Sequence, residues 1–474
     1  MSRVEVLLLS CYELGRQPSG LSWPLAFLAR QGIPARAADL AIEPLPEDAV
    51  RRAQLVAVSV PMHTALRLGL LAGRRVRALN PGVHLCYFGA YAWLNAERLL
   101  EGAADSVIAG EGEETLARLA AALAEGAAPE SVPGVSTPSR PDEPVLERLA
   151  FPVPSRDALP PHGRYAHLVQ DGRRVPVAFA ESSRGCRHTC RHCPVVPVYG
   201  GRFFAVPAAT VLEDVRRQVT AGARHVSFGD PDFLNGPTHA LRVARGLHAE
   251  HPGLSFDFTA KVEHLLRHAA RLPELRALGC LFVVSALESL SDRVLAELHK
   301  GHAGADADRL VDVLDAAGIA LQPTFVPFTP WSSLEDYVGL LDWIEARGLV
   351  RHVPAVQLAV RLLVPPGSAL LGGKARPSWL GPRDDEALGY PWRHPDERMD
   401  ALHAEVSALA ERAEATGRDE LESFEAVRES ARMRAGQPAA APLGPQRAAP
   451  PRLSEAWFCC SEPTGVQVGL LAGP

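Results

Sequence analysis

The chain has 474 residues, with 49 Lys and Arg against 55 Asp and Glu and a formal net charge of -6. At about 100–200 residues per domain, this length allows two or three domains and excludes a single small module. The acidic balance lacks the basic footprint of a general nucleic-acid binder. The longest apolar runs fall well short of the ~20 residues that cross a bilayer, so we expect a cytoplasmic protein without membrane contact.

Five short apolar segments alternate with helix-compatible stretches in the first part of the chain. This alternation predicts a doubly wound parallel α/β sheet in a domain over residues 1–126, with ligands bound at the carboxyl ends of its strands. The expected strands are Val4–Ser10, Ala35–Leu40, Leu55–Val60, Leu85–Gly89 and Ser106–Gly110.

A second alternation of strands and helices follows a segment rich in Pro, Ser and charge, which we interpret as a connection over residues 127–174. The units over residues 175–365 predict a partial (β/α)6 barrel with its site at the carboxyl ends of the strands. The expected strands lie near Val177–Ser183, His225–Gly229, Ser255–Lys261, Leu281–Leu287, Ala320–Phe328 and Val356–Val364.

The rest of the chain reads as a helical extension and a tail. A helix-compatible stretch, Asp396–Arg432, lies in an extension over residues 366–434. Residues 435–451 are almost wholly Ala, Pro, Gly, Gln and Arg, which predicts a semi-extended, flexible linker within the final segment 435–474. The linker carries Ala-Trp-Phe-Cys-Cys-Ser-Glu-Pro, and we expect this apolar, thiol-bearing segment to dock on the body of the protein.

The eight cysteines are too few and too clustered for a disulfide scaffold, which favours a reducing compartment. Three of them lie in Ser-Arg-Gly-Cys186-Arg-His-Thr-Cys190-Arg-His-Cys193-Pro, directly after an expected strand. Soft thiolates at this spacing select an iron–sulfur cluster or zinc. Zinc would need a fourth ligand, for which His188 or His192 is available. Three others, Cys11, Cys86 and Cys280, fall on or beside expected buried strands and are interpreted as core.

The spacing Cys-x3-Cys-x2-Cys resembles the signature of radical S-adenosylmethionine (SAM) enzymes, and the resemblance covers about residues 175–365. It implies a 4Fe-4S cluster held by Cys186, Cys190 and Cys193, with its fourth iron open to SAM. It also implies a transferase that acts on a small molecule or peptide and receives electrons from a donor such as flavodoxin or ferredoxin.

The same resemblance implies SAM-binding groups at the strand ends. For each of them an ordinary role at a strand end or in the barrel interior stays open, since polar residues occupy such positions in any α/β barrel. Three further residues lie at similar positions and could equally be solvated: Lys261, Glu263 and Lys300. The implied groups are His192 at the adenine, Gly229 and Asp230 at the amino group, Ser285 and Glu288 at the ribose, and Arg361 at the carboxylate.

The first domain resembles the cobalamin-binding domain of cobalamin-dependent radical SAM enzymes, and Val-Ile-Ala-Gly110-Glu-Gly-Glu-Glu-Thr is typical of it. Members that supply an axial ligand carry Asp-x-His-x-x-Gly after the first strand, whereas this chain reads Ser10-Cys-Tyr-Glu-Leu-Gly15. The resemblance therefore implies cobalamin without a histidine ligand, or a domain that keeps the shape and no cofactor. Packing within this domain, or exposure at its rim, explains Tyr12, His63 and Trp93 as well as a role in cobalamin binding does.

The ending Cys459-Cys460-Ser461-Glu462-Pro463 resembles that of the CUAEP/CCAEP-tail radical SAM family, with Ser461 in place of Ala and Cys460 where selenocysteine may occur. Adjacent thiols suit capture of a soft atom, nucleophilic attack or hydrogen-atom donation, which makes Cys459 and Cys460 candidate catalytic residues. A structural tail is the alternative.

Three activities stay open at this point. The first is radical alkylation, with cobalamin-associated methyl transfer foremost, or a rearrangement. A related group with a cysteine-rich tail, the radical SAM enzymes of arsinothricin formation, suggests the second, in which a 3-amino-3-carboxypropyl group passes to arsenic or selenium on the tail thiols. The third is a non-catalytic protein that binds a metal or metalloid.

Overall fold

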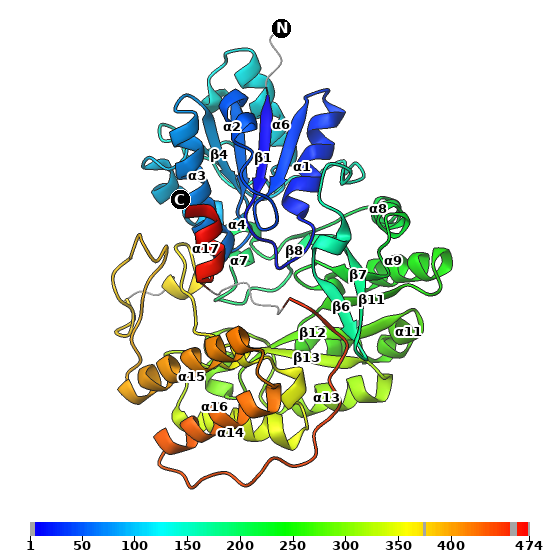
Figure 1. Cartoon of the computed structure of the whole chain (residues 1–474), viewed down its shortest axis with the longest axis vertical. Coiled ribbons are helices and arrows are strands. Elements are labelled where there is room, and N and C mark those ends of the chain that lie inside the picture. Colours follow the sequence, from blue (N-terminus) through cyan, green and yellow to red (C-terminus); the bar gives the residue numbers. More distant parts are fainter. Residues whose placement is uncertain (1–4, 373–375, 456–461, 473–474) are drawn as a thin grey trace.

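The computed structural model describes residues 5–372, 376–455 and 462–472 and forms two α/β units, one above the other in Figure 1. The upper unit is a parallel sheet in the order β2-β1-β3-β4-β5, and the predicted doubly wound sheet is confirmed. The order reverses between β1 and β3, and a switch point of this kind is where such sheets bind ligands. The strands are β1 Val6–Ser10, β2 Ala35–Asp39, β3 Leu55–Ser59, β4 His84–Phe88 and β5 Ser106–Ile108.

Helices cover both faces of this sheet, because its strands are apolar on both sides. One face packs against α1 (Ser19–Arg30) and α6 (Glu113–Ala124). The other packs against α2 (Glu47–Arg52), α3 (His63–Leu79), α4 (Ala90–Leu94) and α5 (Ala96–Leu100). Cys11 and Cys86 are 2% and 0% exposed here, and Cys280 is 0% exposed in the lower unit, which confirms them as core.

The connecting segment runs back along the edge of the upper sheet. It contains the 3-10 turns η1 (Pro129–Ser131) and η2 (His162–Arg164) and forms single bridges from Val107 to Ser136 and from Gly110 to Val145. Gly110 has φ +76°, and a Cβ at this position would lie 2.1 Å from the carbonyl oxygen of Val145. Glycine is therefore required at the start of the Gly-Glu-Gly motif.

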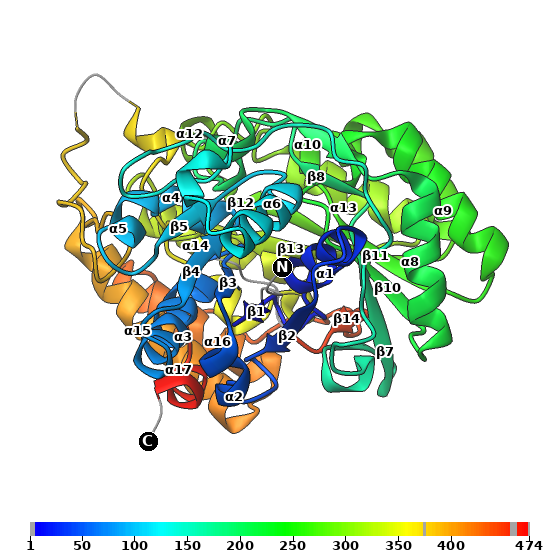
Figure 2. The same ribbon diagram turned by 90° about the horizontal axis from the view of Figure 1, so that it is seen from above.

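The lower unit, partly seen from above in Figure 2, is the expected partial barrel. Its strands follow the order β13-β12-β11-β10-β7-β6-β14. β7 and β10 to β13 run parallel, and β6 and β14 extend the edge antiparallel. The strands are β6 His167–Gln170, β7 Arg173–Ala180, β10 His225–Phe228, β11 Ser255–Thr259, β12 Cys280–Glu288, β13 Ala320–Phe325 and β14 Arg452–Leu453.

Helices and short turns connect these strands on the outside of the barrel. The helices are α8 Ala208–Thr220, α9 Pro237–Glu250, α10 Val262–Arg267, α11 Leu272–Ala277, α12 Asp292–Glu297, α13 Asp306–Ala317 and α14 Leu334–Ala346. The 3-10 turns are η3 Phe233–Asn235, η4 Ala269–Arg271, η5 Val350–His352, η6 Ala355–Leu358 and η7 Ala369–Leu371.

The strand expected near Val356–Val364 is not formed. The turn η6 occupies its first part, and an isolated bridge from Phe328 to Arg361 is all that remains of the pairing. The side-chain oxygen of Gln357 accepts a hydrogen bond from the backbone N–H of Phe325 at 3.2 Å, so a side chain takes a donor that a neighbouring strand would use.

The stretch expected as one helix over 396–432 is two helices, α15 (Glu397–Thr416) and α16 (Glu420–Arg434). Gly417, at φ +61°, ends α15, and the Asp419 carboxylate caps α16 by accepting from the N–H of Leu421 at 2.8 Å. Both helices share the core of the barrel.

Residues 435–451 form no helix or strand, as expected. Contacts hold this segment against the barrel, however, so it is not the flexible linker that its composition predicted. Arg447 donates to both carboxylate oxygens of Asp315 at 2.7 and 2.9 Å, and Gln322 donates to the carbonyl of Pro451 at 2.7 Å. β14 then joins the sheet beside β6. These contacts account for the path of the linker around the lower unit in Figure 1.

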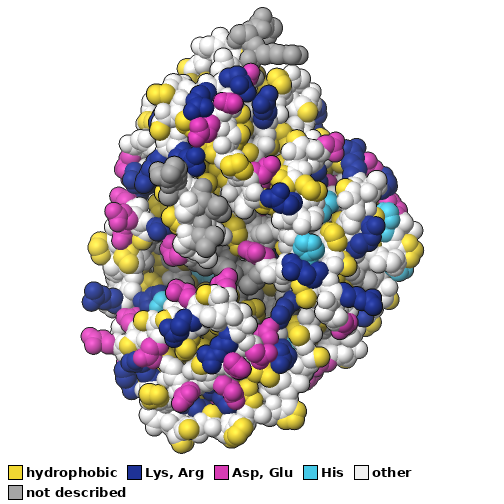
Figure 3. Space-filling view, in the orientation of Figure 1, with side chains coloured by type: hydrophobic (Ala, Val, Ile, Leu, Met, Phe, Trp, Pro, Cys, Tyr) yellow, Lys and Arg dark blue, Asp and Glu magenta, His cyan; other side chains and the backbone are white. Residues whose placement is uncertain are grey.

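The C-terminal helix α17 (Gly465–Ala472) docks on α3, with Leu471 3% exposed. The docking expected of the segment before it stays a prediction, because only Glu462 and Pro463 of that segment are among the described residues. Cys459 and Cys460 lie outside those residues. Among the described helices, none has the length and apolarity needed to cross a membrane. On the face in Figure 3, basic and acidic side chains are interspersed, as on an ordinary solvated surface.

Candidate active site at the cysteine loop

The cysteine loop lies at the carboxyl end of β7, between β8 (Ser183–Gly185) and α7 (Val195–Tyr199). Pairing of β8 with β9 (Phe203–Ala205) draws its two ends together. Gly185 has φ +70°, and a Cβ there would lie 2.5 Å from the ring of Tyr199, so this closure requires glycine. The thiols of Cys186 and Cys190 are buried, and Cys193 is half-buried with its N–H donating to the carbonyl of Cys190 at 3.1 Å.

A charged group lies beside the loop and brings two of the implied SAM-binding residues together. His192 Nε2 and Lys300 Nζ both lie 3.1 Å from Oε1 of Glu288, which is 6% exposed. Burial would raise the pKa of Glu288, yet Lys300 and His192 hold it well below its usual range. Burial likewise opposes the charge of Lys300, but Glu288 and Cys190 raise its pKa above the ordinary value. Glu288 also has φ +64°, at a register shift between β12 and β13.

The donor set at this loop fits a cluster better than a closed zinc site. The proposed fourth zinc ligands are engaged elsewhere, since His192 contacts Glu288 and His188 Nε2 lies 3.4 Å from His264 Nδ1. Three thiolates leave one coordination position open. Burial raises the pKa of Cys186 to about 11, so metal binding there would release a proton. Lys300 supplies compensating positive charge.

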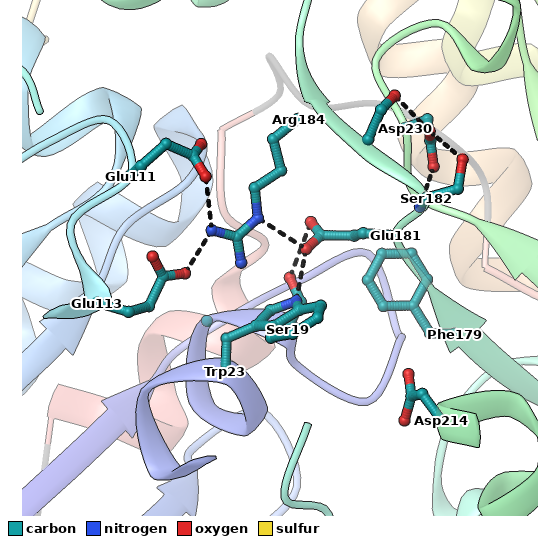
Figure 4. Close-up of polar contacts among 12 residues, drawn as sticks. Ser19, Trp23, Glu111, Glu113, Phe179, Glu181, Ser182, Arg184, Asp214 and Asp230 are labelled. Carbon is teal, nitrogen blue, oxygen red and sulfur yellow. Dashed lines mark hydrogen bonds and ion pairs between the residues drawn. The ribbon is translucent and has the colours of Figure 1, made fainter. Parts of the chain in front are cut away.

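Asp230 and Gly229 pack closely at the end of β10. The Asp230 carboxylate accepts from the Ser182 N–H and hydroxyl, both at 2.7 Å, and from the Ser183 hydroxyl at 2.6 Å (Figure 4). Burial raises the pKa of Asp230 to about 7 despite these bonds. A Cβ at Gly229 would lie 2.1 Å from the Phe179 ring, so glycine is required for this packing. Both residues therefore position the segment that leads into the cysteine loop.

The other two implied SAM-binding residues have protein partners as well. The Ser285 hydroxyl donates to the carbonyl of Ala260 at 2.9 Å. Arg361 donates to Asp400 Oδ1 at 2.8 Å and to the Trp392 carbonyl at 2.7 Å, and its guanidinium lies 3.7 Å from the centroid of the Trp392 ring. Arg361 therefore joins the barrel to α15.

The sequence did not reveal a buried ionic network that joins the two α/β units just before the cysteine loop. Figure 4 shows Arg184 of β8 between Glu111, Glu113 and Glu181. The nitrogen–oxygen distances are 3.4 Å to Glu111, 2.6 Å to Glu113 and 3.4 Å to Glu181. Trp23 of α1 donates to Glu181 at 2.8 Å. The Gly-Glu-Gly-Glu motif and the Arg shortly before the first cysteine of the loop were the signals that could have predicted this pairing.

A cavity of about 280 Å³ opens at the carboxyl ends of β1 and β2. The Tyr12 hydroxyl donates to Glu455 Oε1 at 2.8 Å across it, so the segment that precedes the thiols closes one side. None of the described lining residues is a histidine, and His63 nearby contacts Glu462 at 3.0 Å. The lining includes Cys11, Tyr12, Glu13, Arg16, Asp39, Tyr165, Glu455, Gln467 and Leu471.

Asp39 at this cavity gives a prediction for the pH dependence of stability. Burial raises its pKa from 3.8 to about 7, so between these values the folded state retains a proton that the unfolded state has lost. The contribution of Asp39 to the free energy of unfolding must then fall as pH rises from 5 to 7, by up to ~1.4 kcal/mol per pH unit. Urea denaturation at pH 5, 6 and 7 measures the slope for the whole protein, which should be less negative or more positive in Asp39→Asn than in the wild type. Equal slopes in the two proteins would contradict the assignment.

Residues 181–341, about a third of the chain, match the model of the Radical SAM superfamily. The chain thus carries a radical SAM domain, and the cysteine loop lies at its start. Among curated proteins it is 27% identical to an uncharacterized methyltransferase of Pyrococcus horikoshii, over 42% of this chain and 43% of that one. It is 26% identical to the hopanoid C-3 methylase of Methylococcus capsulatus, over 42% and 38%. The chain thus matches less than half the length of either relative.

Solved structures extend the likeness to the upper sheet. TsrM of Kitasatospora setae, with cobalamin and a [4Fe-4S] cluster bound, superposes with a TM-score of 0.59 at 18% identity, over 73% of this chain and 70% of that one. OxsB with aqua-cobalamin and SAM bound superposes with a TM-score of 0.65 at 15% identity, over 89% and 72%. The chain therefore has the fold of cobalamin-dependent radical SAM enzymes: a Rossmann-like sheet followed by a nearly closed barrel.

Proposed function

We propose that this protein is a radical SAM transferase in which Cys186, Cys190 and Cys193 hold a 4Fe-4S cluster. The observation that carries the proposal is the three-cysteine loop at the carboxyl end of β7, within the segment that matches the superfamily. When bound, the cluster would supply the electron that cleaves the sulfonium of SAM. A donor such as flavodoxin or ferredoxin would reduce it.

The chain's own residues would orient SAM beside the loop. Lys300 keeps Glu288 ionised, and Glu288 holds His192 at 3.1 Å, so a carboxylate and an imidazole lie together beside the cysteine loop. We propose that these two contact the ribose and adenine. Gly229, Asp230, Ser285 and Arg361 would act by positioning the strand ends, given their contacts within the protein.

Anaerobic reconstitution tests the proposal. A radical SAM enzyme takes up ~4 irons per chain and converts SAM to an adenosine product after reduction. A metal- or metalloid-binding protein without catalysis would instead retain stoichiometric zinc and leave SAM intact, which would refute the proposal.

We further propose cobalamin-associated methyl transfer, supported by the fold likeness to OxsB and TsrM and by the cavity at the carboxyl ends of β1 and β2. Cobalamin should bind without a protein nitrogen below the cobalt, since His63 is committed to Glu462. Electron paramagnetic resonance of the cob(II)alamin form tests this. Uniform ¹⁵N labelling of the protein should leave the ligand superhyperfine splitting of the cobalt lines unchanged. A changed pattern would contradict the prediction, and absence of binding would favour aminocarboxypropyl transfer to arsenic or selenium.

Cys459 and Cys460 are proposed to act at the active site. Support comes from the residues on either side of this segment, because Glu455 contacts Tyr12 after β1, and Glu462 contacts His63 after β3. Both contacts lie at the edge of the sheet where doubly wound folds bind ligands.

Substitution of the tail thiols separates a catalytic role from a structural one. Cys459→Ser and Cys460→Ser should leave the melting temperature and the iron content nearly unchanged but suppress product formation at least tenfold, while SAM cleavage continues uncoupled. Calorimetry, iron analysis and product assays measure the three quantities, with Ser461→Ala as the matched control. Full product yield from both cysteine variants would refute the role.

A further inference from the structure

A second group of metal-binding side chains lies beside the cysteine loop. His188 comes from the loop itself, Asp232 follows β10, and His264 lies on α10. The side chains of Asp232 and His264 are 0% and 7% exposed, and that of His188 is 13% exposed. Three separate segments therefore converge on one site that a small ion can reach past His188.

The ligand atoms have the spacing that a transition-metal ion requires. His264 Nδ1 lies 3.0 Å from Asp232 Oδ2, His188 Nε2 lies 3.7 Å from the same oxygen, and the two nitrogens are 3.4 Å apart. Ligand atoms held about 2.1 Å from one ion lie about 3.0 Å apart at a right angle and about 3.4 Å apart at a tetrahedral angle. An ion at the centre of these atoms therefore needs only shifts of a few tenths of an ångström.

Hydrogen bonding alone explains only part of this arrangement. A proton between His264 and Asp232 accounts for their 3.0 Å contact. Asp232 Oδ2 also accepts from the N–H of Lys261 at 3.1 Å, and Oδ1 accepts from the N–H of Leu234 at 2.9 Å. The carboxylate of Asp232 thus already has its backbone donors. A bound ion would explain why His188 Nε2 also lies close to both Asp232 Oδ2 and His264 Nδ1.

The surroundings supply what a ligating imidazole needs on its other side. A metal-bound histidine donates its second ring N–H to an acceptor, most often a carboxylate. Nδ1 of His188 faces Glu263 Oε2 at 3.7 Å and Lys261 Nζ at 3.1 Å, and these two side chains are 3.7 Å apart. When a metal binds His188, we expect Nδ1 of this residue to donate its hydrogen to Glu263 and to lose its contact with Lys261.

We propose that His188, Asp232 and His264 form a binding site for a divalent transition-metal ion of the Zn²⁺ or Fe²⁺ class, separate from the three cysteines. Two imidazoles and a carboxylate are the ligands that these ions take in sites with open positions. The site therefore has room for a water or for an oxygen or nitrogen donor of a substrate. It does not depend on the chemistry proposed at the cysteine loop.

Zinc uptake by the cluster-loaded full chain tests the site. After equilibrium dialysis against Zn²⁺, elemental analysis should find one more zinc per chain in the wild type than in Asp232→Asn or His264→Ala, with equal iron in all three. His268→Ala is the matched control, since its ring is 6.0 Å from that of His264 and outside the ligand set, and it should retain the wild-type zinc. Any zinc that the tail cysteines bind is present in all four proteins, so it does not change the difference in zinc content between them. Equal zinc in all four proteins would overturn the proposal.

A measurement on a protein with the proposed ligands intact keeps the test decisive if Asp232→Asn fails to fold. In the cluster-loaded Cys459→Ser, Cys460→Ser protein, which has no tail thiols, the zinc K-edge spectrum at one zinc per chain should show nitrogen and oxygen neighbours at about 2.0–2.1 Å. A spectrum fitted by sulfur neighbours alone, at about 2.3 Å, would refute the assignment.

Discussion

Replacement of Cys186, Cys190 or Cys193 with Ala should abolish the brown iron–sulfur absorbance and SAM cleavage while the protein stays folded. Each thiolate would hold one iron, and the loop offers no replacement because His192 contacts Glu288 and His188 faces His264. Iron content should fall from ~4 per chain to a small fraction after reconstitution, and SAM turnover by at least 1,000-fold, equivalent to ~4 kcal/mol.

The control for these variants is Cys280→Ala, which removes a fully buried thiol of β12 outside the loop. It should keep its iron and its activity, at a modest cost in stability from the lost packing. Iron content by elemental analysis and SAM consumption by chromatography give the two readings. Wild-type turnover in any of the three loop variants would exclude the proposed cluster.

Arg184→Met should destabilise the folded protein by about 3–5 kcal/mol, because it leaves buried carboxylates without their cation. Glu111 is fully buried in this network, and burial already raises its pKa to about 7 while Arg184 opposes the rise. Arg184→Lys keeps the charge but loses the planar, multidentate geometry, so it should recover only part of the loss. Urea denaturation at pH 7 measures the difference.

The matched control for Arg184 is an exposed arginine. Arg447 pairs with Asp315 where their side chains are 35% and 46% exposed, and exposed pairs contribute about 0–1 kcal/mol. Arg447→Met should therefore lie close to the wild type. If Arg184→Met is no less stable than Arg447→Met, the network does not hold the two α/β units together.

The fold was predictable because its signals are local. Five apolar segments at regular spacing correspond to β1 to β5, and the same alternation predicted the parallel strands of the barrel. The strand expected near Val356–Val364 failed because a side chain, Gln357, satisfies the backbone donor of Phe325. The break between α15 and α16 was visible as Gly417, a residue type that commonly ends a helix in the left-handed conformation observed here, but it was not used.

The site was predictable where one loop holds all its parts and not where distant segments meet. The three cysteines lie within eight residues, and their spacing alone indicated the chemistry. His188 and His264 are 76 residues apart, and Arg184 meets Glu111 across 73 residues, so only the fold brings these side chains together. Asp230 and Arg361 are of a suitable type to bind SAM, but their side chains have partners within the protein, so a contact of either residue with SAM stays a prediction.

The identity of the adenosine product tests the central claim most directly. Anaerobically reconstituted protein, reduced with dithionite and given SAM, should release 5′-deoxyadenosine, and the Cys190→Ala variant should release none. Chromatography with mass detection distinguishes this compound from methylthioadenosine. Release of methylthioadenosine alone, or intact SAM in the presence of a full iron–sulfur cluster, would contradict the account.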